Sequence, residues 1–173
     1  PNAQGFDHSF GHMGGCIDNW SHFFYWGGPN IHDLHRNGAE VFADGRHFGT
    51  QMVEEAARFM TASKSKEQPF FLYVAPFVPH APATPAPRHV DAFPGVQAPR
   101  TASFNQADVS AEPQWLRGRP LLNDRQIGSI DALYRKQLQS MLAVEDLIEH
   151  VVDTLRQTGE LDTERPNTDA QNQ

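Results

Sequence analysis

The sequence predicts an α/β fold, because it carries two amphipathic helices and one short buried strand. Apolar residues recur at helical spacing over 49–62 and 124–158, and a dense apolar run covers 70–75. A helix that leads into a buried strand is half of a βαβ unit, from which α/β proteins are built. The 173 residues correspond to about one domain.

The first 47 residues are rich in glycine, histidine and aromatic residues and show no sustained hydrophobic period. Asn37-Gly38 is a strong turn signal, since both residues accept the positive φ angles of a tight hairpin. We therefore predict a short hairpin over 34–42 and irregular structure elsewhere in this region.

The helix predicted over 49–62 places Glu54 and Glu55 on its outer face. Its apolar face is formed by residues three and four positions apart: Met52, Val53, Ala56, Phe59 and Met60. A polar connector then leads to the apolar run.

The run 70–75, FFLYVA, is predicted to be a buried strand because it is rich in aromatic and β-branched residues. His80 follows it in a loop that prolines stiffen. A buried strand that hands a polar residue to a stiff loop is a common way to build an active site in α/β enzymes. The prolines that exclude a helix here are Pro76, Pro79, Pro82, Pro85 and Pro87.

Residues 76–123 show no regular pattern apart from a turn of helix expected at 87–93. A stretch of this length without secondary structure is usually functional or disordered. The helix predicted over 124–158 has Asp124 as its N-cap and Gly159 at the position after its last residue. One long face of this helix is expected to pack on a sheet or a partner.

The composition limits the classes of function. A formal net charge of −7 argues against nucleic-acid binding, and no apolar run reaches the roughly 18 residues of a membrane span. The first ten residues lack the basic and apolar segments of a signal peptide. The single Cys16 excludes an internal disulfide framework.

Several side chains are candidates for chemistry. Imidazole and carboxylate groups bind zinc-like metals, but the glycine-rich setting favours scattered loop histidines, and we assign no metal ligand in the chain. Cys16 is interpreted as a small buried thiol rather than a nucleophile. His80 fits hydrogen bonding to an anion or proton donation to a leaving oxygen, because imidazoles change protonation near neutral pH. Five arginines could bind an anionic substrate, although for each of them an ordinary charged surface residue is the favoured interpretation. They are Arg88, Arg100, Arg117, Arg119 and Arg125.

Three segments, in order, carry a resemblance to a known family. GFDHSFG from Gly5, DLHRNG from Asp33 and PFFLYVAPFVPHAP from Pro69 resemble segments of type I sulfatases, in the alkaline-phosphatase-like superfamily. The second half, from PRTASFNQADVS through TGELD, is closer to N-acetylglucosamine-6-sulfatases than to other arylsulfatases. The resemblance implies a partial alkaline-phosphatase-like domain over 1–162, with an incomplete central sheet and a long C-terminal helix, followed by an unstructured tail over 163–173.

The resemblance implies sulfate ester hydrolysis by a formylglycine and calcium mechanism, acting on aryl sulfates or sulfated glycans. His80 corresponds to the catalytic histidine of the PHxP segment. Asp18 and His22 are expected near the substrate pocket. A secreted, periplasmic or lysosomal parent is implied by analogy.

The departures from the family pattern are large. The formylglycine motif CxPSR is absent, because Cys16 is followed by Ile-Asp-Asn-Trp. The calcium ligands, the GKxH-type lysine segment and the final DNG segment are also absent from the sequence. We therefore expect this chain to be an internal fragment, inactive and marginally folded without the remainder of the sulfatase domain.

Two other readings stay open. The chain can belong to a phosphodiesterase or phosphonate hydrolase of the same superfamily, which the residue at the nucleophile position would reveal. It can also be a non-catalytic remnant that binds metal through His32 and His35, or glycan through Arg117 and Arg119.

Overall fold

The computed structural model describes residues 1–26, 30–67 and 69–161, which divide into two compact units. The first unit comprises Pro1–Phe77 and the chain from Ala143 onward, and the second is Val78–Leu142. Helices and a small sheet occur together, so the α/β class with an incomplete sheet is confirmed. The tail predicted over 163–173 lies outside the described residues, and the domain boundary at 162 stays a prediction.

The sheet of the first unit has three short antiparallel strands in the order β1-β2-β3. They are β1 (Phe10–Gly11), β2 (His35–Arg36) and β3 (Ala39–Glu40), with Phe10 opposite Arg36 and His35 opposite Glu40. Asn37 and Gly38 form the β2–β3 turn with φ angles of 51° and 81°. The predicted hairpin is confirmed, whereas β1 was not predicted because two residues are too short to show a period.

The core of this unit consists of Ile17, Leu34 and Phe48, all at most 4% exposed. Phe10 and Phe77 pack around them, so the strand, the hairpin and the start of the helix share one apolar cluster. A 3-10 turn at Asn2–Gln4 precedes the sheet.

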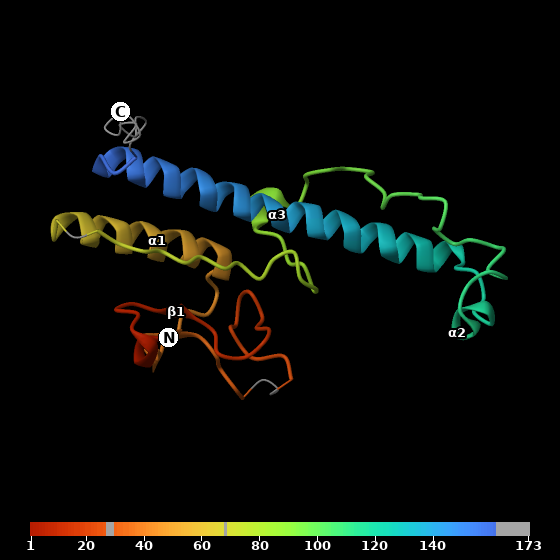
Figure 1. Ribbon diagram of the computed structural model, residues 1–173, viewed down its shortest axis with the longest axis horizontal. Coiled ribbons are helices and arrows are strands. Elements are labelled where there is room, and N and C mark those ends of the chain that lie inside the picture. The colour runs from red at the N-terminus through yellow and green to blue at the C-terminus, as the bar shows by residue number, and fades with distance from the viewer. Residues whose placement is uncertain (27–29, 68, 162–173) are drawn as a thin grey trace, which may run out of the picture. The chain divides into compact units, whose positions relative to one another are not determined.

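Helix α1 (Phe48–Ser65) confirms the helix predicted over 49–62. It runs beside the C-terminal half of α3 (Asp124–Thr158) within the first unit (Figure 1). Gly49 faces the methyl group of Ala143, and Lys64 forms a 2.8 Å ion pair with Glu160. A larger side chain at Gly49 would meet the ring of His47.

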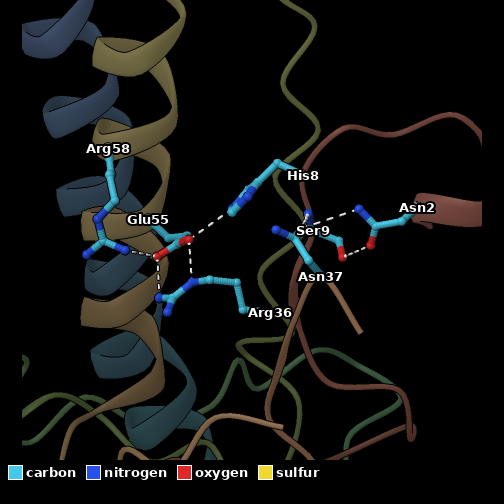
Figure 2. Close-up of polar contacts among 7 residues, drawn as sticks. All are labelled: Asn2, His8, Ser9, Arg36, Asn37, Glu55 and Arg58. Carbon is cyan, nitrogen blue, oxygen red and sulfur yellow. Dashed lines mark hydrogen bonds and ion pairs between the residues drawn. The ribbon is translucent and has the colours of Figure 1, made fainter. Parts of the chain in front are cut away.

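Glu55 lies in a buried ion-pair cluster rather than on the outer face of α1, so that expectation was wrong. Figure 2 shows its carboxylate accepting two hydrogen bonds from Arg36, at 2.9 and 2.7 Å, and contacting Arg58 and His8. The carboxyl-bearing side chain is only 8% exposed. Helical period could not reveal this, because Arg36 reaches Glu55 from the distant hairpin.

We expect Glu55→Gln to lower the free energy of unfolding by about 1–3 kcal/mol, since it leaves Arg36 poorly paired. Burial alone would raise the pKa of Glu55, but hydrogen bonds and charge from Arg36 outweigh it, and the pKa lies below its ordinary value. The stabilisation is therefore present above the ordinary pKa of about 4.3 and is lost as the pH falls through the folded pKa.

Urea unfolding of a sulfatase domain that contains this chain, at pH 7 and pH 3.5, measures this effect. Glu54→Gln is the matched control, because Glu54 is 43% exposed and pairs with Arg46 at the surface. Equal losses for the two variants at pH 7 would contradict the role given to Glu55.

Residues 70–75 are extended but pair with no strand among the described residues, so the strand predicted there is not formed. Phe70, Leu72 and Val74 are half-buried, whereas Phe71 and Tyr73 are each 74% exposed. This alternation is the side-chain pattern of a strand without the hydrogen bonds of one. None of the three strands in the described part of the chain pairs with this segment.

Helix α3 has the bounds that the sequence predicts, and Gly159 follows it with a φ of 72°. The N-cap, however, is Asn123 rather than Asp124. Asn123 and Gln126 exchange two 3.0 Å hydrogen bonds between side chain and backbone N–H. This reciprocal pair is a capping box, and it makes Asn123 the N-cap and Asp124 the first residue of the helix.

The second unit is mostly loop, with a 3-10 turn at Pro87–His89 and the short helix α2 (Gln114–Arg117). Side chains on the first half of α3 hold this loop by its backbone. Asp131 accepts a hydrogen bond from the N–H of Ala98, and Gln139 donates to the carbonyls of Val90 and Ala92. Arg135 donates to the carbonyl of Val96. Among the described helices, none combines the length and the apolar character of a membrane-spanning segment.

Candidate functional site

His80 lies in the second unit, exposed, on the proline-rich loop that follows the extended segment. Its Nδ1–H donates to the carbonyl of Ala81 at 2.7 Å, which leaves Nε2 as the nitrogen available to a ligand. The loop closes on itself through a 2.9 Å hydrogen bond from the N–H of Ala83 to the His80 carbonyl. Gln137 of α3 donates to the Pro79 carbonyl.

Asp18 lies in the first unit and organises a tight turn. Its Oδ1 accepts hydrogen bonds from the N–H groups of Trp20 and Ser21 at 2.9 and 2.8 Å, and from the Ser21 hydroxyl. Its Oδ2 accepts one from Tyr25 at 3.3 Å. Burial would raise the pKa of Asp18, but these hydrogen bonds lower it below its ordinary value. The carboxylate thus stays charged, and its oxygens already serve the turn.

His22 ends the same turn, with its backbone N–H 3.0 Å from the Asp18 carbonyl and a φ of 58°. Its side chain is completely buried, and its Nε2 lies 3.1 Å from the carbonyl of Arg46. Burial is the main cause that lowers the pKa of His22, and the hydrogen bond to Arg46 offsets it only in part. The imidazole is therefore neutral near pH 7.

His32 and Asp44 join His22 to form a cluster that sequence spacing did not reveal. One ligand atom from each lies within 4.8 Å of the other two, and within the described residues no other group of three such side chains does so. His35 is not part of it and lies 3.4 Å from Asp33 instead. The three residues come from separate irregular segments, so no periodic signal marks them.

The other candidates have structural partners. Cys16 is 2% exposed, and burial raises the pKa of its thiol, which fits a core residue rather than a nucleophile. Arg100 forms two hydrogen bonds with Asp131, at 2.8 and 2.7 Å, and stacks over Phe104. Arg100 is therefore committed to this ion pair.

A cavity of about 510 Å³ opens in the first unit along the extended segment. Its lining is mainly apolar and includes Phe6, Met52 and Phe59, with His8 and Glu55 as polar members. Asp18 and His22 of the same unit do not line it. Its apolar walls suit packing by further chain better than hydrolysis of a charged ester.

Comparison with known proteins gives one consistent result. The family model described as Sulfatase matches residues 1–163. The chain is 35% identical over 127 residues to "Sulfatase ppz1" of Metarhizium majus (strain ARSEF 297), covering 69% of this chain and 30% of that protein. It is 38% identical over 100 residues to N-acetylglucosamine-6-sulfatase of Homo sapiens, covering 57% of this chain and 18% of that protein.

Solved structures show the same fold. The structure of Ps i-CgsB superposes with a TM-score of 0.64 at 20% identity, covering 94% of this chain and 31% of that one. The same protein in complex with k-i-k-neocarrahexaose gives a TM-score of 0.62 at 21% identity, covering the same shares of the two chains. The chain spans less than a third of the length of each of these relatives. Because the family match covers nearly all of the chain, it belongs to the sulfatase family, a family of sulfuric ester hydrolases.

Proposed function

We propose that this chain is the central part of a sulfatase domain that hydrolyses sulfate esters of glycans or aryl sulfates. The family match over residues 1–163 is the observation that carries the proposal. The named sulfatases among its relatives and the glycan in the complex of Ps i-CgsB support a sulfated glycan as substrate.

His80 is the catalytic residue in this proposal. Because Nδ1–H is held by the Ala81 carbonyl, Nε2 is free to face the ester. A protonated Nε2 would donate its proton to the bridging oxygen as the sulfur–oxygen bond breaks, and the electron pair of that bond would stay on the oxygen. The nucleophile, a formylglycine in this proposal, would come from outside these 173 residues.

That Asp18 and His22 lie near the substrate pocket remains a prediction. The hydrogen bonds to Asp18 and the burial of His22 make positioning of the turn a better role for them than direct contact with substrate. Their distance from a bound substrate in the complete domain would test this.

Calcium does not fit the ligand set of this chain. The ion takes six to eight oxygen ligands, whereas the one cluster found in the described residues offers two imidazole nitrogens and one carboxylate. The proposal therefore places the calcium ligands, like the nucleophile, in the remainder of the domain and assigns no step here to the ion.

The proposal is tested by comparing the rates at which the domain cleaves a sulfate monoester and a phosphodiester. A domain that contains this chain should release sulfate from glucosamine-6-sulfate or an aryl sulfate, and the 173-residue chain alone should release none. Faster cleavage of a phosphodiester or phosphonate by the domain would overturn the proposal in favour of a phosphoryl-transfer member of the superfamily. Turnover by the chain alone would show that it needs no further residues.

A further inference from the structure

We propose that His22, His32 and Asp44 form a binding site for a divalent transition-metal ion, with zinc as the best fit. The proposal rests on the geometry of these three side chains and not on the sulfatase activity proposed above. Asp44 Oδ1 lies 3.8 Å from His22 Nδ1 and 3.5 Å from His32 Nε2. All three ligand atoms lie within 4.8 Å of one another.

The two separations that involve Asp44 are close to what zinc requires. Tetrahedral zinc holds nitrogen and oxygen ligands at about 2.0–2.2 Å, which places neighbouring ligand atoms about 3.3 Å apart. The Asp44 oxygen is near that spacing from both imidazoles. Its side chain is 57% exposed and can move to close the site, whereas the two histidines are fixed by burial.

The nitrogens that face the site lack hydrogen-bond partners. His22 Nδ1 and both ring nitrogens of His32 are buried and make no hydrogen bond. The side chains of His22 and His32 are 0% and 4% exposed. A buried polar atom without a partner costs free energy, and a metal ion would satisfy the inward-facing nitrogens.

The opposite nitrogen of each imidazole faces an oxygen acceptor. His22 Nε2 lies 3.1 Å from the Arg46 carbonyl and 3.0 Å from Gln51 Nε2. His32 Nδ1 lies 3.2 Å from a Glu40 oxygen, although the two do not form a hydrogen bond. Histidines that bind metals commonly donate their second N–H to a carbonyl or carboxylate, which leaves a lone pair on the nitrogen facing the metal. Both imidazoles have such an oxygen on the side away from the site, and metal binding would favour the tautomer whose N–H points to it.

Two imidazoles and one carboxylate select a metal of the zinc class rather than calcium or magnesium. Water would supply the fourth ligand that zinc takes at such sites. The three residues come from the turn that Asp18 organises, from the segment before β2 and from the segment before α1. A bound metal would therefore fasten together a region that has little regular secondary structure.

The test uses a chelator-treated sulfatase domain that contains this chain, resupplied with calcium and titrated with zinc, with cobalt(II) as a spectroscopic substitute. We expect one equivalent of zinc per chain with an apparent Kd near or below about 1 μM, and visible cobalt absorption that zinc removes. Asp44→Asn should weaken zinc binding at least about tenfold. Asp7→Asn, which changes an exposed aspartate outside the cluster, should bind like the unaltered chain.

Unfolding the protein in urea distinguishes metal binding by the folded cluster from metal binding by histidines of the unfolded chain. The cobalt absorption should disappear in about 8 M urea if the folded cluster makes the site. Equal zinc affinity for Asp44→Asn and Asp7→Asn, absorption that persists in urea, or less than half an equivalent bound would each overturn the proposal.

Discussion

Replacing His80 by alanine in a sulfatase domain that contains this chain should lower kcat by about 10²–10⁴-fold, the usual contribution of a general acid. The melting temperature should change little, because His80 is exposed and its side-chain hydrogen bond is to the neighbouring residue Ala81. Steady-state kinetics and thermal unfolding of the same preparation measure both effects.

Comparing esters with different leaving groups distinguishes proton donation by His80 from simple binding of the substrate. If Nε2 donates a proton, His80→Ala should affect esters of sugar alcohols more than esters of acidic phenols, whose oxygens leave without a proton. His150→Ala removes an exposed histidine from α3 and is the matched control. Near-normal turnover by His80→Ala would refute the role assigned to His80.

The 173-residue chain alone should lack a cooperative unfolding transition and should aggregate on heating. Its extended segment 70–75 exposes Phe71 and Tyr73, and no described strand covers its backbone groups. Uncovered apolar strands are templates for association between chains. Differential scanning calorimetry and light scattering at several concentrations measure this behaviour.

Two lysine variants distinguish the extended segment from general apolar exposure. Tyr73→Lys should slow aggregation, because charge on an edge strand opposes pairing. Trp115→Lys is the control, since Trp115 is 71% exposed but lies on the helix α2. A single sharp transition with an enthalpy near the roughly 120 kcal/mol expected for a folded chain of this length would contradict the prediction.

Sequence predicted the elements whose signals are local. The helix periods, the Asn37-Gly38 turn and the glycine after α3 each depend on neighbouring residues, and the structure has all of them. The prediction of a strand at 70–75 was wrong because a strand depends on residues far away in the sequence. Its side chains have the pattern of a strand, but a ladder requires partner strands, and the described residues supply none for this segment.

The candidate site was less predictable than the fold. The strand and the proline-rich loop pointed to His80, and resemblance identified Asp18 and His22. Nothing in residue spacing joins His22 to His32 and Asp44. That cluster depends on the positive φ of His22 and on the turn that Asp18 caps. The ion pairs of Glu55 likewise join segments far apart in sequence, and helical period assigned that residue to the wrong face.

The loop-holding side chains of α3 have a consequence for how this family can change in length. Asp131, Arg135 and Gln139 are four residues apart, so they recur on one side of the helix about every 6 Å. One residue inserted between them would turn the following contacts by about 100° and release the loop. Insertions between 106 and 120 add residues neither to α3 nor to the segment 90–98 that it holds, so they would leave these contacts in register. Length variation among relatives should therefore concentrate there.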